Sequence, residues 1–489
     1  MSSEMYFATT MFLLFLSYIA ITLFSRTNKH INLPPGPSLL TLLRSATEFE
    51  LGKQKPQHLL AQYSKIYGPI MHLKLGQITT FVISSPEIAQ EVLQTHDLFL
   101  SDRTIPQAVA VLDHQHFSLP FMPACDLWRD LKKICKNHLF ASKTLDASYQ
   151  LRCNKLQDFL CDIDRSSIRG EAVDIGRAAF KTTLNFLSNT FFSRDFANSA
   201  GETDEYKDII ENLVRVIGTP NLVDFFPALG MFDPQGIKGT SATYLEKLLQ
   251  IIDSYTTKRL KLREDENYVP NDDMLDMLLN ISKENGQKMD NTKIKHLFLD
   301  LFVAGTDTTS YTIERAMAEL VHNPHVMSKA KEELEQVIGI GNSIDESDIT
   351  KLPYLQAVVK ETLRLHPSAP LLLPRKARKD VKICGYTIPQ GSQILVNEWA
   401  MGRNPSIWNN PNMFSPERFL GSEINFKGQY FQFTPFGGGR RMCPGMPLAI
   451  RMLHTMLGSL INSFDWKKEN GDRDVDQPLR AIPIRVKKV

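Results

Sequence analysis

The sequence has few cysteines and almost no net charge, and each shortage excludes a class of protein. There are six cysteines in 489 residues and no C-x-x-C pair, so neither a zinc ribbon nor a dithiol redox motif is indicated. Scattered thiols in a long chain are more typical of a reducing compartment than of a disulfide scaffold. A net charge of +2 gives no electrostatic footprint for nucleic acid.

Internal repeats and low-complexity tracts are also missing, and no convincing dinucleotide fingerprint is present. The run Gly437-Gly438-Gly439 lacks the strand–turn–helix setting and the following acid that such a fingerprint requires. What the chain does contain is 43% hydrophobic and 22% charged residues, a composition that allows a sizeable globular core. The length fits two or three average domains or one large enzyme.

The N-terminus carries a long uncharged run, from Met5 to Ser25. About 20 apolar residues are enough for a helix to cross about 30 Å of hydrocarbon. The alternative is a cleaved signal peptide, but the run is long for one and no small-x-small cleavage site follows it. Arg26 and Lys29 follow the run, whereas only Glu4 precedes it, so the positive-inside rule places the C-terminal side in the cytosol. We therefore expect residues 1–28 to be a single-pass membrane anchor.

A proline-rich segment, Leu33-Pro34-Pro35-Gly36-Pro37, comes next. Proline fixes φ and prevents a helix from continuing, so this segment predicts a stiff spacer. We assign residues 29–40 to this hinge and residues 41–489 to a catalytic domain.

The rest of the chain predicts a mainly α fold with small β regions. Helical periodicity or helix-start signals occur at 54–66, from Pro86, at 127–140, over most of 145–290 and at 300–320. Alternating or β-rich stretches occur at 72–75, 79–83, 382–397 and 479–487. Breaks are expected at 218–220, 226–227 and 263–273, and residues 103–122 should form a long loop.

One cysteine lies in an unusual setting, the stretch Phe436-Gly437-Gly438-Gly439-Arg440-Arg441-Met442-Cys443-Pro444-Gly445. The glycines let the backbone approach a large flat group, and the arginines can bind carboxylates. An apolar helix-like run follows, and a helix N-terminus stabilises a thiolate. The alternative is a buried free cysteine in a glycine-rich turn.

The spacing of Phe436, Gly439, Arg441, Cys443 and Gly445 resembles the haem-binding signature of the cytochrome P-450 monooxygenases. This resemblance implies the mainly helical fold of that family. It also implies haem b as cofactor, with the Cys443 thiolate as the axial ligand to iron. The implied reaction inserts one oxygen atom from O2 into a C–H bond.

The middle of the predicted helix 300–320 reads Ala304-Gly305-Thr306-Asp307-Thr308, a polar notch in an apolar helix. The threonine could simply bond back to the preceding turn. The stretch also resembles the oxygen-activation motif of the same family. In that interpretation Thr308 hydrogen-bonds dioxygen and Asp307 helps to relay protons.

Two charged motifs follow in the order found in the family. Glu361 and Arg364 would be an ordinary surface ion pair if they stood alone. Together with Arg418 they resemble the family's buried Glu-x-x-Arg network, which we interpret as structural. The resemblance also implies that the haem propionates are bound by Arg441 and Arg375, and then by Trp128 and Lys132. Relatives usually have arginine where this chain has Lys132, and lysine keeps the charge but loses the planar fork.

The predicted helix 127–140 has basic residues at three- and four-residue spacing. They are Arg129, Lys132, Lys133 and Lys136. Such a face can be an ordinary solvated surface. The resemblance implies instead that it meets a membrane-bound reductase, which supplies electrons from NADPH at the endoplasmic reticulum. The expected partners are therefore this reductase, O2, membrane lipid and a small lipophilic substrate.

The stretches that form the substrate pocket in the family are apolar in this chain. They contain Ile105, Val109, Leu112, Phe117, Leu213, Phe225, Phe226, Leu301, Phe302, Ala304, Ala369, Leu371 and Leu372. Such walls bind by apolar burial, with orientation set by shape, and a weakly polar terpenoid suits them.

Details at 103–109, 232–236 and 436–448 resemble the plant branch that contains geraniol hydroxylases and diterpene oxidases. Two alternatives stay open. One is a haem-thiolate isomerase or dehydratase of the same fold, and the other is a membrane-anchored haem sensor without enzymatic activity.

Overall fold

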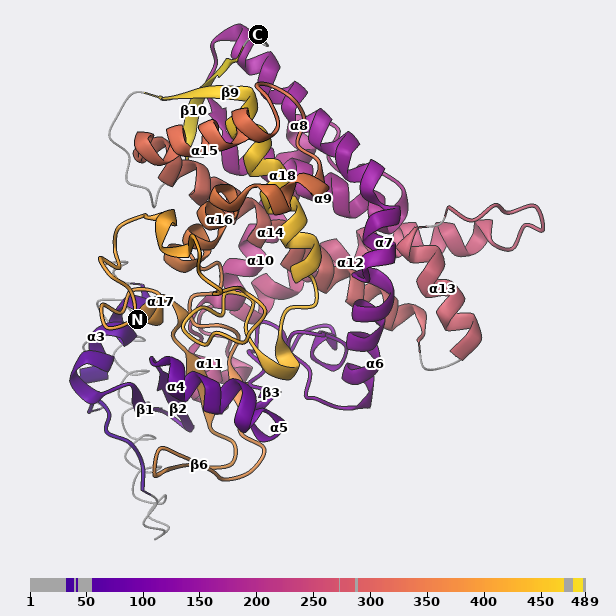
Figure 1. The fold of residues 1–489 in the computed structure, drawn as a ribbon. Coiled ribbons are helices and arrows are strands. Elements are labelled where there is room, and N and C mark those ends of the chain that lie inside the picture. Colours follow the sequence, from indigo (N-terminus) through magenta and orange to yellow (C-terminus); the bar gives the residue numbers. More distant parts are fainter. Residues whose placement is uncertain are drawn as a thin grey trace, which may run out of the picture.

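The computed structural model describes residues 32–38, 41–42, 55–271, 273–285, 289–469 and 478–486. Over these ranges the fold is mainly helical with small sheets (Figure 1). The α-helices are α3 (Pro56–Tyr67), α4 (Pro86–Gln90), α5 (Asp97–Leu100), α6 (Asp126–Ile134), α7 (Ser142–Ala147), α8 (Tyr149–Arg169), α9 (Ile175–Phe192), α10 (Ala200–Gly218), α11 (Leu222–Phe225), α12 (Ile237–Leu262), α13 (Met274–Asn285), α14 (Asn291–His322), α15 (Pro324–Val337), α16 (Pro353–Leu365), α17 (Glu398–Met401) and α18 (Met446–Ser463).

Short 3-10 and π-helical turns connect several of these helices. They are η1 (Glu91–Thr95), η2 (His114–His116), η3 (Cys135–Leu139), η4 (Pro227–Met231), η6 (Glu346–Lys351), η7 (Pro416–Phe419) and η8 (Gly439–Arg441).

The strands form small sheets at two sides of the helical body. They are β1 (Ile70–Leu75), β2 (Ile78–Ile83), β3 (Asp102–Arg103), β4 (Val173–Asp174), β5 (Arg375–Lys376), β6 (Val381–Ile383), β7 (Tyr386–Ile388), β8 (Gln393–Val396), β9 (Phe464–Lys468) and β10 (Arg480–Arg485). The largest sheet has the order β1-β2-β8-β5-β3, in which only β2 and β8 pair in parallel. A three-stranded sheet has the order β4-β10-β9, and β6 pairs with β7.

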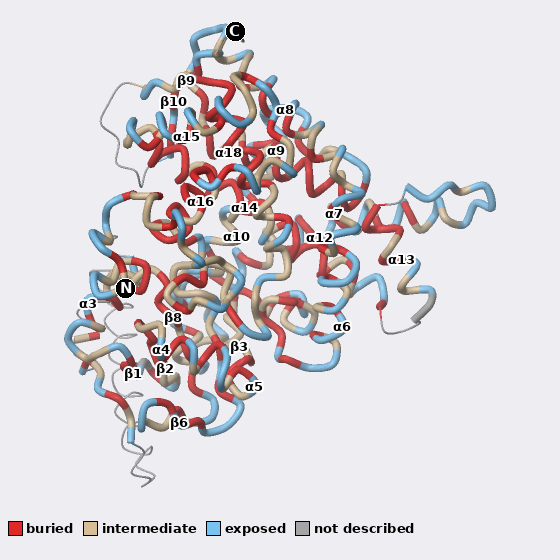
Figure 2. Tube along the Cα trace, viewed as in Figure 1, coloured by how far each residue is buried: buried red, intermediate tan, exposed pale blue. Residues whose placement is uncertain are grey.

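Helix α14 runs through the centre of the molecule and is buried over most of its length (Figure 2). Its N-cap is Asp290, whose side chain accepts a hydrogen bond from the Lys293 amide. Gly305 allows α14 to approach α9, because a Cβ at that position would lie 2.9 Å from Leu187 Cδ1. This contact fixes the position of the polar notch of α14 relative to α9.

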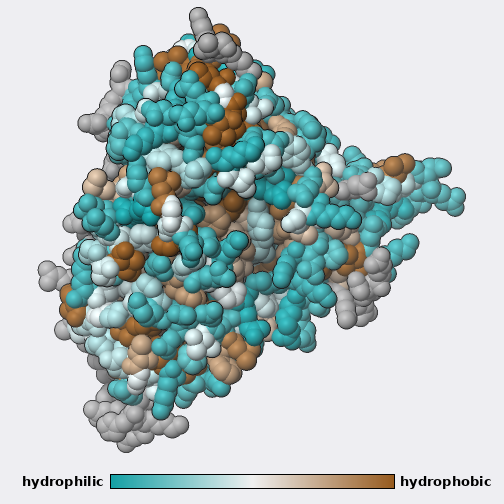
Figure 3. All heavy atoms as spheres, viewed as in Figure 1, coloured by the Kyte–Doolittle hydropathy of each residue, from teal (hydrophilic) through white to brown (hydrophobic). Residues whose placement is uncertain are grey.

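The core has two main parts. A large apolar cluster joins α8, α9, α14, α16 and α18, and a smaller one lies between the five-stranded sheet and α4. Hydrophilic side chains cover most of the face seen in Figure 3. Both clusters meet near the loop that contains Cys443, and this places the loop between the sheet region and the helical body.

The element predictions are largely confirmed. Helix 54–66, the strand pair before Pro86 and the breaks near 218–220 and 263–273 all appear within a few residues. The central helix begins earlier than expected, at Asn291. The helix expected at 127–140 is α6 followed by the π-helical turn η3.

The proline-rich segment lies against β1 instead of standing free. The His72 amide donates to the Pro35 carbonyl at 3.1 Å, and His72 Nδ1 lies 2.6 Å from the Pro34 carbonyl. A Cβ on Gly36 would lie 1.9 Å from the His72 carbonyl oxygen, so the close approach requires glycine. We call residues 33–37 with this docking the strap.

No helix in the described part of the chain is long and apolar enough to cross a membrane. The expected anchor, residues 1–28, lies outside the described residues.

Candidate active site

Cys443 is held in a tight loop that leads into α18. Its amide donates to the Phe436 carbonyl at 3.0 Å, and this closes the loop. Burial raises the pKa of the Cys443 thiol, while the amides of Gly445 and Met446 and the charge of Lys132 oppose the rise. Cys443 is nevertheless an exposed residue. A metal placed there would reach the sulfur and favour the thiolate.

Four cationic side chains gather beside this loop, and Arg441 is the best anchored of them. It donates to the carbonyls of Ser101, Leu119 and Met122 at 2.7, 3.2 and 2.6 Å. Its guanidinium lies 4.4 Å from the ring centroid of Trp128, whose indole N–H donates to the Leu119 carbonyl at 3.2 Å. Arg441 and Trp128, two of the predicted propionate ligands, are therefore in contact with each other.

Arg375 and Arg103 are both buried. Arg375 donates to Asp97 at 2.7 Å and to the Gly438 carbonyl at 2.8 Å. Arg103 donates to the Leu373 carbonyl at 2.6 Å and thereby joins the start of the 103–122 loop to the segment before Arg375. Arg375 is predicted from the sequence to bind a propionate, whereas no sequence signal indicates that Arg103 lies in the same cluster.

Lys132 is turned toward the cysteine loop. Its ammonium donates to the carbonyls of Arg440 and Met442, at 3.1 Å in the second case. Burial and the nearby charge of Arg441 lower the pKa of Lys132 to about 8. The lysine thus supports the backbone next to Cys443 as well as adding a positive charge.

The four cationic side chains of this cluster carry more positive charge than the neighbouring carboxylates neutralise. Burial and mutual repulsion lower the pKa of Arg103 and of Lys132, and they lower the pKa of Arg441 to about 10. Burial also lowers the pKa of Arg375. Within the described ranges, Asp97 is the one carboxylate that hydrogen-bonds any of these four cations. A dianion such as a pair of haem propionates would satisfy this arrangement, so the residues fit the expected group.

The polar notch in α14 faces open space at one position. Ala304 is exposed although most of its helix is buried, and the Thr308 hydroxyl donates to the Ala304 carbonyl at 2.7 Å. Burial, together with repulsion from Glu211, raises the pKa of Asp307 to about 6, while Lys207 opposes the rise. Thr308 therefore forms the local bond that the sequence left open as an alternative, and Asp307 can exchange a proton near neutral pH.

The Glu-x-x-Arg network is complete and buried. Arg364 forms two hydrogen bonds with Glu361, at 2.7 and 2.8 Å, and Arg418 adds a third at 3.0 Å. The Ser415 amide donates to the same carboxylate at 2.8 Å. The geometry agrees with a structural role, since it ties α16 to the turn at 416–419.

A buried carboxyl that the sequence did not single out holds the start of the cysteine loop. Glu398 accepts from the Thr434 amide at 2.6 Å and from its hydroxyl at 2.7 Å. Burial raises the pKa of Glu398 to about 7. No spacing or composition signal marks Glu398, because its partner is 36 residues away in sequence.

The predicted pocket residues are placed in different surroundings. Phe302 stacks among Phe191, Phe192 and Phe196 with centroids 4.8–5.9 Å apart, so its ring belongs to the aromatic core between α9 and α14. Val109 and Leu213 are also buried. Leu301 is buried as well. The half-buried members are Ile105, Phe117, Phe225, Phe226, Ala369, Leu371 and Leu372, and the exposed ones are Leu112 and Ala304.

The predicted basic face is divided in two. Arg129, Lys133 and Lys136 are exposed, whereas Lys132 points inward to the cysteine loop. Arg129 also pairs with Asp126.

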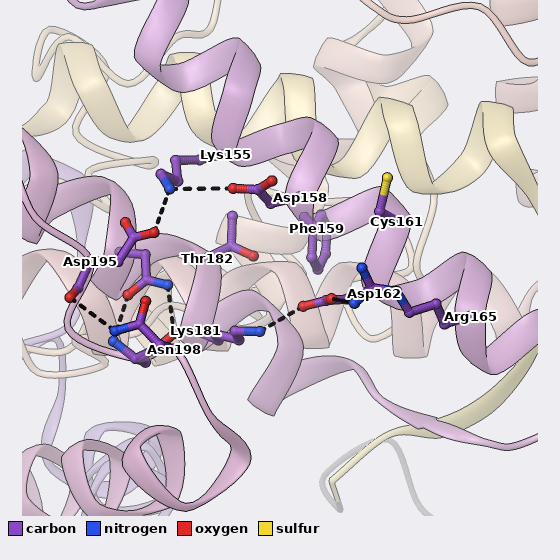
Figure 4. Close-up of a pocket in the computed structure, with 12 residues that line it drawn as sticks. Lys155, Asp158, Phe159, Cys161, Asp162, Arg165, Lys181, Thr182, Asp195 and Asn198 are labelled. Carbon is purple, nitrogen blue, oxygen red and sulfur yellow. Dashed lines mark hydrogen bonds and ion pairs between the residues drawn. The ribbon is translucent and has the colours of Figure 1, made fainter.

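A separate polar pocket lies between α8, α9 and residues 195–198 (Figure 4). Its charges pair within the pocket: Lys155 binds Asp195 at 2.7 Å, and Lys181 binds Asp162 at 2.7 Å. It contains none of the residues predicted for the active site and is not the site described above.

Comparison with known proteins agrees with the geometry. The sequence model described as cytochrome P-450 matches residues 34–487. The chain is 46% identical over 480 residues to a geraniol 8-hydroxylase of Swertia mussotii, covering 95% of this chain and 96% of that protein. It is 44% identical over 485 residues to a ferruginol synthase of Isodon rubescens, covering 96% and 98%. A solved zebra fish cytochrome P-450 with progesterone superimposes with a TM-score of 0.72 at 24% identity, covering 88% of this chain and 98% of the other.

Proposed function

Because this chain belongs to the cytochrome P-450 family, we propose that it hydroxylates a small terpenoid, using O2 and electrons that a separate reductase delivers from NADPH. Family membership makes the protein a haem-thiolate monooxygenase that acts on a lipophilic substrate with O2 and a redox partner. The terpenoid, the reductase and the individual site residues are the proposal.

The observation that carries the proposal is the exposed residue Cys443 in the loop beside the four-cation cluster. Cys443 would hold the haem iron, and Arg441, Arg375, Lys132 and Trp128 would hold its propionates. When bound, a thiolate-ligated haem supplies the activation of O2 for insertion into a C–H bond.

The residues of α14 would handle the protons of this reaction. The Thr308 hydroxyl lies beside the exposed Ala304, where it can orient a proton donor. Asp307 lies next to it, and its raised pKa lets it accept and release a proton near neutral pH. The two residues together would form a short relay toward α10, where Glu211 is located.

The substrate class rests on the relatives and on the wall of the site. One relative is named for hydroxylation of geraniol and another for synthesis of ferruginol. The half-buried residues Ile105, Phe117, Ala369 and Leu371 are apolar and cannot bind a carboxylate or an amine. Such a wall favours a compact, weakly polar molecule, which it would orient by shape.

The proposal includes a membrane location. Residues 1–28 would anchor the chain in the endoplasmic reticulum with the catalytic part in the cytosol, and residues 29–40 would connect the two. The exposed part of the basic face would meet the reductase.

The experiment is product analysis with reductase and NADPH. Monoterpenoid, sesquiterpenoid and diterpenoid alcohols and hydrocarbons are incubated beside simple phenylpropanoids, and hydroxylated terpenoids are expected. Turnover confined to the phenylpropanoids would contradict the terpenoid assignment.

Cys443→Ala is the matched control. It should remove both the thiolate-type Soret band of the reduced carbon monoxide complex and all turnover. If folded Cys443→Ala protein kept that band, the assigned iron ligand would be wrong.

A further inference from the structure

The 103–122 loop is fastened to α14 by a buried polar cluster that the reaction does not use. The Asp300 carboxylate accepts from the Leu119 amide at 2.7 Å and from the Ser118 hydroxyl at 3.0 Å. His114 Nε2 lies 3.2 Å from the same carboxylate, and His114 Nδ1 lies 2.9 Å from His296 Nδ1. All five residues are less than 9% exposed.

The rings in this cluster are stacked as well as hydrogen-bonded. The centroids of His114 and His296 are 5.1 Å apart with planes 24° apart, and Phe117 stacks on His296 at 5.0 Å and 17°. Burial, together with the nearby His114, lowers the pKa of His296 to about 4, so His296 is neutral at physiological pH. One of the two Nδ1 atoms therefore donates an ordinary N–H···N hydrogen bond to the other.

The loop backbone is bent to reach this cluster. Leu112 and Asp113 both have positive φ, 50° and 56°, a conformation that bulky side chains avoid. They stand directly before His114 and turn the chain toward α14. The contacts of Asp300 and His296 with the loop stabilise this strained backbone conformation.

The cluster lies on the same face of α14 as the open part of the site. His296, Asp300, Ala304 and Thr308 follow one another at four-residue spacing and so share one side of the helix. The loop is also bound to the cation cluster: Arg103 donates to the Leu373 carbonyl, and Arg441 donates to the carbonyl of Leu119, whose amide donates to Asp300. The loop thus spans from the cation cluster to α14, one turn before Ala304.

We propose that Asp300, His114 and Ser118 are positioning residues that hold the 103–122 loop as a fixed wall of the substrate site and thereby limit substrate size. They touch neither the cysteine loop nor the notch residues Asp307 and Thr308. Their effect comes through Ile105, Val109 and Phe117, which the fixed loop carries. This inference rests on the proposed function only for the identity of the substrate.

The test uses the haem-loaded full chain and ligands that need no turnover. Asp300→Leu removes both acceptor oxygens at similar side-chain volume, and Ser118→Ala removes one hydrogen bond. His114→Phe keeps the ring stack but loses both polar contacts. His454→Phe is the matched control, because His454 is a buried, hydrogen-bonded histidine of α18 outside the cluster.

Stopped-flow spectra would follow the binding of imidazole and of the large azole clotrimazole to the haem iron. In Asp300→Leu we expect the association rate of clotrimazole to rise about tenfold, which corresponds to about 1.4 kcal/mol. The rate of imidazole should stay unchanged, and Ser118→Ala should show a smaller change in the same direction. His454→Phe should alter neither rate.

Hydrogen exchange gives the second readout. The Leu119 amide and amides at 104–118 should exchange faster in the cluster variants, while amides of α9 should not change. A merely destabilised protein would exchange faster everywhere. Unchanged loop exchange and unchanged azole rates in haem-loaded Asp300→Leu and Ser118→Ala would overturn the proposal.

The terpenoid panel separates this proposal from the proposed function. In the cluster variants, turnover should shift from monoterpenoids toward diterpenoids. If no terpenoid is turned over by any variant but the azole and exchange results hold, the substrate assignment is wrong and the fixed wall stands.

Discussion

Gly439 and Gly445 belong to the same cysteine loop, but the structure gives them different reasons to be glycine. Gly439 has φ +65°, and a Cβ there would lie 2.1 Å from the Leu93 carbonyl oxygen and 2.8 Å from Asp97 Cγ. At Gly445 the nearest atoms, Cys443 Sγ and Phe140 Cζ, would both be 3.9 Å away. The first glycine is required by packing against η1 and α5, whereas the protein leaves room at the second.

This difference predicts unequal effects of the same substitution. Gly439→Ala combines a left-handed backbone with overpacking, so we expect it to destabilise the protein by about 2–5 kcal/mol. Gly445→Ala should fold nearly as well as the wild type. Thermal unfolding together with the yield of haem-loaded protein measures both, and equal losses in the two variants would contradict the packing argument.

Asp307 predicts a pH effect on coupling, meaning product formed per NADPH consumed. Because its pKa is raised to about 6, the carboxyl is neutral below that pH and ionised above it. The neutral acid is the form that delivers a proton, so coupling should fall as the pH rises through about 6. Asp307→Asn should lose this inflection.

Glu211→Gln is the control for this pH effect, because Glu211 repels the Asp307 carboxylate. Removing that charge should move the inflection to lower pH. A wild-type profile without an inflection between pH 5 and 8 would refute the relay.

At the scale of elements, the strap makes residues 33–37 part of the sheet region. Gly36→Ala would place a methyl group 1.9 Å from the His72 carbonyl oxygen and 3.0 Å from the carbonyl carbon of the same residue. We expect the strap to detach, with a loss of about 1–3 kcal/mol and faster protease cleavage at 32–38, while the Soret spectrum stays unchanged.

Gly201→Ala is the matched substitution, because Gly201 is in α10 and, apart from its chain neighbours and nearby backbone of its own helix, no described atom lies within 4 Å of the place its methyl group would take. Its cleavage pattern should equal that of the wild type. Unaltered cleavage in Gly36→Ala would show that the strap tolerates the methyl group.

Helices and strands were predictable where a local periodicity, a proline or a polar stretch marks their ends. Pro86 at the first turn of α4 and the polar stretch between α12 and α13 are local signals, and the structure agrees with them. The π-helical turn after Ile134 has no such signal. The sequence also placed Lys132 on the basic face, because its contact with the Met442 carbonyl is 310 residues away in sequence. The cysteine motif could be recognised because all of its residues lie within one short stretch of the sequence.

The partners of that motif were harder to find. Asp97 and Glu398 reach it through tertiary contacts with Arg375 and Thr434, and no sequence period joins residues so far apart. Asp97 and Glu398 contact the motif because the fold buries them beside it, and this burial depends on the packing of the whole chain. For the same reason the sequence placed Phe302 in the pocket, whereas its ring packs among the phenylalanines of α9.

At the scale of the whole molecule, the net charge is small, so attraction to a partner must come from local patches. Lys133→Glu with Lys136→Glu should slow electron delivery from the reductase, most strongly at low salt, because salt screens exposed charges. Lys258→Glu with Lys261→Glu on α12 makes the same charge change elsewhere and should have little effect. Stopped-flow reduction across a salt series compares the two pairs.

The outcome that favours an ordinary solvated face is equal reduction rates for both pairs at every salt concentration. Both double variants must first show the wild-type haem content, since Lys132 next to the patch contacts the cysteine loop.

From the four-cation cluster we also expect the cellular amount of this enzyme to depend on the supply of haem. Mutually repelling buried cations gain stability from a bound dianion, and a ligand that binds only the native state raises the folded fraction. A chain synthesised while porphyrin or iron is scarce would stay less stable and be degraded sooner. The amount of active enzyme would then depend on haem supply as well as on transcription, because the cation cluster makes the stability of the chain depend on bound haem.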